Sequence, residues 1–171
     1  MMKRAISILS CLLICISGLC QQKDIQALAA KMASSRISLS FRFNPAGKTK
    51  SIVAGTLTVQ GNCFLVSTGS QRIISDGKTC WTVDDSTEEV YIEKGGRLPY
   101  FFTDPASMAA ALSNVTRLSD GYRGVFTVPD DSQKYDFELR NIKTSAPTKG
   151  TAEFTFDPEK LGGDWVVTDL R

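Results

Sequence analysis

Two hydrophobic periodicities divide the chain between one helix and a long series of strands. Residues 24–35 carry an apolar residue at every third or fourth position, which predicts an amphipathic helix capped by Asp24. From Ile37 to Phe43 apolar and polar residues alternate, which predicts a half-buried strand. The alternation returns in short segments separated by turn residues, at 52–60, 63–66, 72–75, 79–83, 89–93, 122–128, 134–142, 150–156 and 164–170.

The segment between residues 94 and 113 breaks this rhythm. Gly95 and Gly96 interrupt the sheet, and Asp104 caps a short helix that places Met108 and Leu112 one turn apart. The segment also holds three consecutive aromatic residues, which cannot all point into one core and which suit a lid or the mouth of a cavity: Tyr100, Phe101 and Phe102.

These elements predict a mostly β (α+β) fold with about ten strands in an antiparallel meander. A sheet of that size must curl, close on itself or be covered. Two short helices can cover only part of its apolar face. The pattern leaves open whether the interior is a packed core or a cavity.

The first twenty residues have the layout of a secretory signal peptide. Lys3 and Arg4 precede an apolar run from Ala5 to Ile16, which is too short to span a bilayer comfortably. Leu19 stands where a lipoprotein signal requires a small residue before the acylated cysteine, so we expect ordinary cleavage after Cys20. The predicted division is therefore a signal peptide at 1–20 and one domain at 21–171.

Charge and composition exclude several classes of function. Removing Lys3 and Arg4 from the 20 basic residues leaves 18, equal to the 18 acidic ones, so no nucleic-acid partner is expected. The chain has no histidine, which removes the commonest general base and most metal sites. Adjacent carboxylates such as Asp84 and Asp85 are turn residues. We expect no enzymatic activity, no cofactor and no metal.

The cysteines Cys63 and Cys80 are predicted to be free thiols. Phe64 and Trp81 are expected to point inward and the two cysteines outward. The strand at 72–75 separates the two cysteine strands, and strands two apart are about 9–10 Å from each other, beyond the reach of a disulfide.

The hairpin Ser75-Asp76-Gly77-Lys78-Thr79-Cys80-Trp81 resembles the LolA family of periplasmic lipoprotein carriers. The order of the other segments is similar too: a first helix, then Gly55-Thr56-Leu57, then the hairpin, a helix in mid-chain and a late strand at 153–158. The resemblance implies a curved antiparallel sheet forming an incomplete, half-open β-barrel covered by short helices. The implied protein is a periplasmic monomer without a cofactor that takes acylated lipoproteins from an inner-membrane release transporter to an outer-membrane acceptor.

The resemblance and the alternating pattern together give a set of candidate residues for a hydrophobic cavity and its lid. Apolar walls suit acyl chains because each buried methylene contributes about 0.8 kcal/mol without specific contacts. The candidates are Leu39, Phe41, Phe43, Leu57, Phe64, Val66, Trp81, Tyr100, Phe101, Phe102, Met108, Leu112, Phe126 and Phe137.

One turn departs from the family pattern. Proteobacterial members carry an arginine followed by proline after the second strand, and that arginine helps to hold the lid closed. This chain reads Val59-Gln60-Gly61-Asn62 there, so Gln60 offers only a neutral hydrogen bond. Two alternatives stay open: an outer-membrane acceptor resembling LolB and acylated at Cys20, and a periplasmic sensing or scaffold domain with a closed core.

Overall fold

The structure is a computed structural model that describes residues 23–32, 34–46, 53–95, 110–128 and 132–171. Residues 23–32 form a helix, as the periodicity predicts. Its residues Ile25, Ala29 and Met32 are buried in one cluster with side chains of the sheet. No helix within the described ranges is long and apolar enough to cross a membrane.

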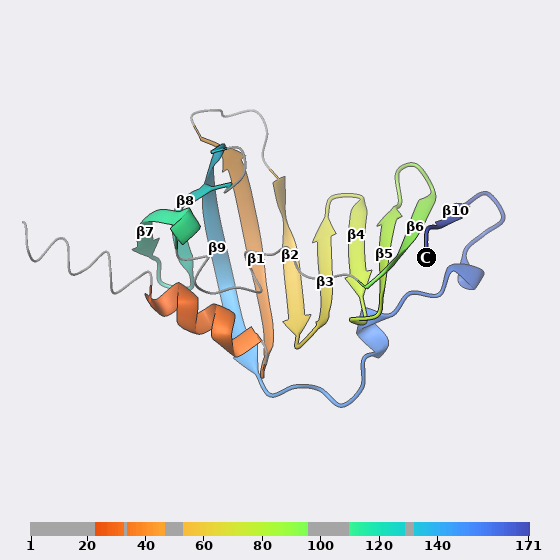
Figure 1. The fold of residues 1–171 in the computed structure, drawn as a ribbon, viewed down its shortest axis with the longest axis horizontal. Coiled ribbons are helices and arrows are strands. Elements are labelled where there is room, and N and C mark those ends of the chain that lie inside the picture. Colours follow the sequence, from red (N-terminus) through yellow and green to blue (C-terminus); the bar gives the residue numbers. More distant parts are fainter. Residues whose placement is uncertain (1–22, 33, 47–52, 96–109, 129–131) are drawn as a thin grey trace, which may run out of the picture.

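Ten strands of the described residues form one open sheet, so the expectation of a mostly β fold with one large antiparallel sheet is confirmed (Figure 1). The strand order is β10-β6-β5-β4-β3-β2-β1-β9-β8-β7, and every neighbouring pair is antiparallel except β10 and β6. The expectation of a simple antiparallel meander is wrong at two places, because β9 lies beside β1 and β10 runs parallel to β6. The strands are β1 (Arg36–Pro45), β2 (Val53–Gln60), β3 (Cys63–Thr68), β4 (Gln71–Ser75), β5 (Thr79–Asp84), β6 (Glu89–Lys94), β7 (Leu112–Arg117), β8 (Tyr122–Thr127), β9 (Lys134–Ser145) and β10 (Val166–Asp169).

The hairpin that carries the family resemblance is held by its own turn chemistry. The Asp76 carboxylate accepts hydrogen bonds from the backbone N–H groups of Lys78 at 2.8 Å and Thr79 at 2.7 Å. Gly77 has a φ of +86°, in the left-handed region that favours glycine. The Ser-Asp-Gly-Lys-Thr sequence therefore has a local structural role in joining β4 to β5.

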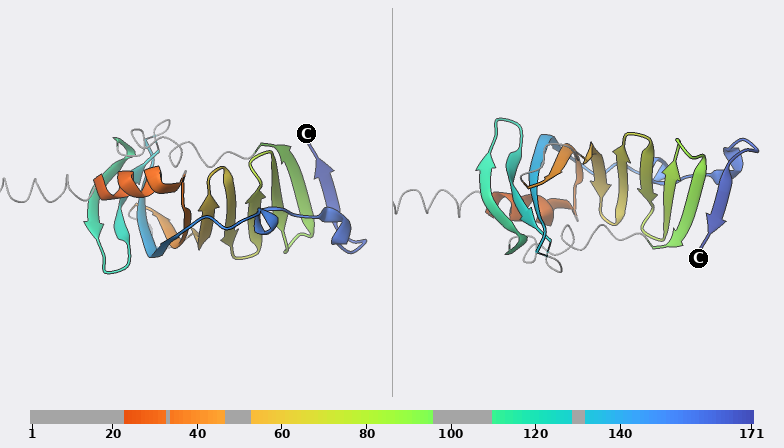
Figure 2. Two further views of the ribbon diagram at one scale, coloured as in Figure 1. Left: turned by 90° about the horizontal axis from the view of Figure 1, so that it is seen from below. Right: turned by 90° about the horizontal axis from the view of Figure 1, so that it is seen from above.

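The two faces of the sheet have different covers. We call the side on which residues 23–32 pack the helix face; both views of Figure 2 place this helix at the β7–β9 end of the sheet, with the C-terminus at the other end. Residues 146–165 follow β9 and lead to β10 (Figure 1), and we call this segment the C-terminal strap. The opposite, strap face holds a second apolar cluster that includes Phe156, Leu161 and Trp165 of the strap.

The strap contains two short 3₁₀ helices, η1 (Ala152–Phe154) and η2 (Pro158–Lys160). Contacts at η1 attach the strap to the sheet. Phe154 is fully buried, at 0% exposure. The guanidinium of Arg36 pairs with Glu153 and lies 5.9 Å from the centre of the Phe154 ring.

Two predictions about secondary structure are wrong. Residues 150–156 do not join the sheet as a strand, because this segment crosses the strap face and buries Phe154 there. Leu112, predicted on a helix, begins strand β7, which the sequence pattern missed. Polar residues dominate β7, and Asn114 has a positive φ of 51° beside an irregularity in the pairing with β8, so no clean alternation marks this strand.

Candidate functional site

A single row of side chains crosses the helix face from the middle of the sheet to its β10 edge. Directly paired residues on neighbouring strands share a face, so the row follows from the strand register. Its members are Leu39, Leu57, Val66, Ile73, Thr82, Tyr91 and Thr168.

Burial decreases along this row with distance from the helix. Leu39 is 4% exposed and Leu57 is 2% exposed, whereas Val66 and Ile73 are half-buried and Tyr91 is 39% exposed. The helix therefore covers the part of the row on β1 and β2, and the side chains of the row become more accessible to solvent toward β6.

Aromatic residues of β1, β8 and β9 extend the apolar helix face toward the β7 end of the sheet. Phe41 and Phe43 lie with their ring centres 5.7 Å apart, and both pack against the buried cluster. Phe43 is in register with Phe137 of β9, and Phe126 of β8 belongs to the same cluster. The result is an apolar face contributed by strands from both halves of the chain.

Nine of the predicted cavity residues gather in or against this one cluster. They are Leu39, Phe41, Phe43, Leu57, Phe64, Val66, Leu112, Phe126 and Phe137. The predicted residues Tyr100, Phe101, Phe102 and Met108 lie outside the described residues.

Trp81 is the exception, because it lies on the strap face. It packs with Ile74, Val83 and Val90 in the second cluster, whereas Phe64 belongs to the cluster on the helix face. Phe64 pairs with Ser75, and Ser75 pairs with Cys80. The residue that shares a face with Phe64 is therefore Cys80, and its neighbour Trp81 points to the other side.

The same register separates the two cysteines. Cys80 is buried on the helix face, while Cys63, next to Phe64, points to the strap face and donates a hydrogen bond to the carbonyl of Asp76 at 3.3 Å. Both are free, as predicted, although the expectation that both point outward on one face is wrong. Burial, and secondarily the charge of Glu93, raises the pKa of the Cys80 thiol; burial and Asp76 raise the pKa of the Cys63 thiol.

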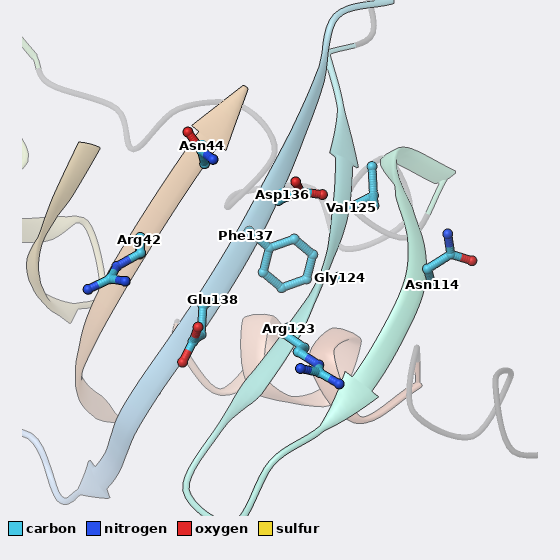
Figure 3. Close-up of a pocket in the computed structure, with 9 residues that line it drawn as sticks. All are labelled: Arg42, Asn44, Asn114, Arg123, Gly124, Val125, Asp136, Phe137 and Glu138. Carbon is cyan, nitrogen blue, oxygen red and sulfur yellow. The ribbon is translucent and has the colours of Figure 1, made fainter. Parts of the chain in front are cut away.

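Two depressions lie elsewhere, among polar residues of β1, β2, β7, β8 and β9. The first has a volume of about 400 Å³, and Arg42, Glu138 and Arg123 line it in register across β1, β9 and β8 (Figure 3). These three residues point away from the helix face, because Phe41 and Phe43 on either side of Arg42 belong to it. Phe137 also contributes to the lining.

The second depression, of about 470 Å³, is lined by an ion-pair network. Arg140 lies 3.0 Å from a carboxylate oxygen of Asp120 and 3.3 Å from one of Glu138. Acidic and basic side chains thus balance each other there. Polar residues make up most of the lining of both depressions. No group of three or more metal-ligating residues occurs among the described parts of the chain.

Gln60, which stands where the family has its arginine, bonds to the C-terminal strap. Its side-chain amide donates to the carbonyl of Thr148 at 3.1 Å, and its oxygen accepts from the Thr148 N–H at 2.8 Å. Gln60 pairs with Arg36 and Cys63 on the strap face. These bonds therefore lie on the face opposite the candidate cavity.

No protein-family model and no curated protein matches the chain. One similar solved structure is the crystal structure of an uncharacterized conserved protein from Thermus thermophilus. It shares 12% sequence identity at a TM-score of 0.49, and the similarity covers 86% of this chain and 98% of that one. At this level the similarity assigns neither a family nor a function.

Proposed function

We propose that this chain is a periplasmic carrier similar to the LolA family, which binds the acyl chains of lipoproteins on the helix face and delivers them to the outer membrane. The observation that carries the proposal is the row of mostly apolar side chains on that face, whose polar members are Thr82 and Thr168. It runs from the buried Leu57 to Tyr91, which is 39% exposed, so the described apolar surface is wider than the helix that packs on it.

The chemistry of this surface suits acyl chains. Leu, Val, Ile and Phe side chains offer contact area without directional bonds, and each methylene removed from water contributes about 0.8 kcal/mol. A lipid held in this way can be released again, because its binding depends on area and no covalent step is involved. No catalytic role is proposed for any residue of the chain.

The finer fold is part of the proposal. The open sheet would form an incomplete barrel, with the helix of residues 23–32 as a cover. The family's arginine lock is absent, and the side chain of Gln60 is engaged by Thr148 on the other face. In this carrier, opening of the cover over the helix face would therefore not require breaking a hydrogen bond from an arginine at the position of Gln60.

A release assay tests the proposal directly. The purified chain, added to spheroplasts, is expected to release lipoproteins from the inner membrane into the soluble fraction. Ile73→Ser should weaken release, since Ile73 is a half-buried residue of the helix face. Leu65→Ser is the matched control, because Leu65 is also half-buried but packs in the cluster on the strap face. Equal effects of the two variants, or no release at all, would refute the carrier.

Quenching by brominated acyl chains locates the lipid. In a Trp81→Phe, Trp165→Phe background, a tryptophan introduced by Val66→Trp should be quenched, while one introduced by Leu65→Trp should keep its emission. The two positions are adjacent in β3 and point to opposite faces. Stronger quenching at position 65 would place the lipid under the strap and reject the helix face.

Two measurements separate the alternatives. Mass spectrometry of the mature N-terminus distinguishes the carrier from a LolB-like acceptor, which requires an acylated Cys20. Lipid extraction from the purified chain distinguishes the carrier from a sensing or scaffold domain. Recovery of no lipid, together with no lipoprotein release, would favour the scaffold.

A further inference from the structure

The exposed large hydrophobic side chains of the described residues are concentrated at one edge of the sheet. Val166, Val167 and Leu170 are 58%, 45% and 60% exposed, and Tyr91 on the neighbouring strand β6 is 39% exposed. Val53 is the one exposed large hydrophobic residue of the described chain that lies away from this edge. Strand β10, which carries or adjoins three of these residues, ends the sheet on this side (Figure 1).

The backbone of β10 has one set of hydrogen-bonding groups directed away from the sheet. The N–H of Val166 donates to the carbonyl of Glu88 at 2.9 Å, and the N–H of Leu170 donates to that of Ile92 at 2.8 Å. Even-numbered residues thus turn their backbone groups toward β6. Because these groups alternate along a strand, those of Val167 and Asp169 point outward, and no other strand of the described residues pairs with them.

We propose that β10 pairs with β10 of a second copy of this chain, antiparallel and about a twofold axis at Thr168. In this arrangement Val167 and Asp169 exchange backbone hydrogen bonds with Asp169 and Val167 of the second copy. The two ten-stranded sheets join edge to edge, with both helix faces on the same side. This inference is independent of the proposed cargo.

Side-chain complementarity selects the second copy as the occupant and fixes the register. Residues directly opposite each other share a face, so Val166 meets Leu170 of the second copy twice, and Thr168 meets its own counterpart. The two most exposed hydrophobic residues of the edge are thereby covered.

The neighbouring registers are worse. A twofold axis at Val167 leaves Leu170 beyond the pairing partners of the strand, and an axis at Asp169 places two carboxylates opposite each other. In the proposed register each Asp169 lies opposite Val167 and keeps its own ion pair, 2.6 Å to Arg171 of the same chain. The row on the helix face also becomes continuous, since Tyr91 pairs with Thr168 in each copy.

The interface is small, because β10 spans only Val166–Asp169. Small interfaces are typical of reversible complexes, and we expect a dissociation constant on the order of 10–100 µM. The purified 171-residue chain should therefore sediment as a mixture of monomer and dimer that shifts with concentration in analytical ultracentrifugation.

Val167→Pro tests the edge. Proline removes an outward N–H that β6 does not use, so the pairing of β10 with β6 is retained while the dissociation constant rises at least tenfold. Circular dichroism should be unchanged. A chain that stays monomeric at millimolar concentration, or a dimer that Val167→Pro leaves intact, would overturn the proposal.

A charge pair tests the register. Val166→Glu alone and Leu170→Lys alone should each weaken the dimer at least tenfold, while the double variant V166E/L170K should recover most of the loss, because it places opposite charges across the axis at both positions. Single variants that dissociate without recovery in the double variant would reject this register. Capture of an unrelated strand, with no self-association, would reject the second copy as the occupant.

Discussion

The side-chain amide of Gln60 bonds to both backbone groups of Thr148, in the way that the backbones of neighbouring strands bond to each other. The Gln60 amide donates to the Thr148 carbonyl at 3.1 Å and accepts from its N–H at 2.8 Å, with a further bond from the Thr148 hydroxyl at 3.2 Å. This contact holds the start of the C-terminal strap at the end of β2. The strap is thereby directed across β3 toward Phe154.

Replacing Gln60 by alanine should loosen the strap while the sheet stays intact. The lost bonds are partly solvated, so we expect the free energy of unfolding to fall by about 1 kcal/mol. Hydrogen exchange should accelerate at the Thr148 and Phe154 amides. Gln71→Ala is the control: it also removes a glutamine side-chain bond, to Asp84, but at a distance from the strap. Equal acceleration at the strap amides in both variants would contradict this role of Gln60.

Phe154 should contribute more to stability than any other residue of the strap. Its side chain is fully buried, so Phe154→Ala leaves a cavity and is expected to cost about 3–5 kcal/mol in urea-induced unfolding. Phe156→Ala, at a half-buried position of the same segment, should cost about 1–2 kcal/mol. A smaller loss for Phe154→Ala than for Phe156→Ala would show that the strap does not pack as described.

The two thiols should be free and slow to react. Burial raises the pKa of both Cys63 and Cys80, and the charges of Asp76 and Glu93 act in the same direction. At pH 8 both thiols are therefore mostly protonated, and a disulfide-exchange reagent should label them slowly in the native chain. In denaturant without a reductant both should react rapidly. Absence of that reaction would reveal a bridge between cysteines that the structure places on opposite faces.

Asp84 should make stability depend on pH at the acidic end. Hydrogen bonds from the Ser86 side chain, then from Gln71, lower the pKa of Asp84 to about 2. A carboxyl group with a lowered pKa in the folded state adds stability above its ordinary value of about 4, and this is lost as the pH falls through about 2.

Urea midpoints measured at pH 5, 3 and 2 should therefore decrease less steeply in Asp84→Asn than in the parent chain. Ser86→Ala should give an intermediate slope, because it removes the largest cause of the lowered pKa. Identical slopes in all three chains would show that the hydrogen bonds to Asp84 do not form in solution.

Local patterns located most of the secondary structure. Alternation predicted β1 through β6, β8, β9 and β10 to within a few residues, and the 3.6-residue period predicted the first helix. These predictions succeed because side-chain direction depends on a residue's immediate neighbours along the chain. The same logic failed at 150–156, where Phe154 and Phe156 alternate as in a strand but pack down onto the strap face.

The face on which Trp81 lies can be assigned only from the register of three strands, β3, β4 and β5. Phe64 packs in the cluster on the helix face and Trp81 in the cluster on the strap face. Alternation along a strand shows that a residue is buried, but it does not show on which face of the sheet. The register through Ser75 decides it. For the candidate site, alternation therefore grouped the chosen residues of β1, β2 and β3 on one face but assigned Trp81 of β5 to the wrong face.

The sequence by itself determined the mostly β class and the apolar character of the residues now found on the helix face, because these depend on composition and on the period of each segment. Only the tertiary structure decided that the sheet has two apolar faces, that the segment after β9 covers the second, and that β10 ends the sheet in parallel with β6. Those features arise from contacts between residues far apart in the chain, such as Arg36 with Glu153 and Gln60 with Thr148, which no local pattern encodes.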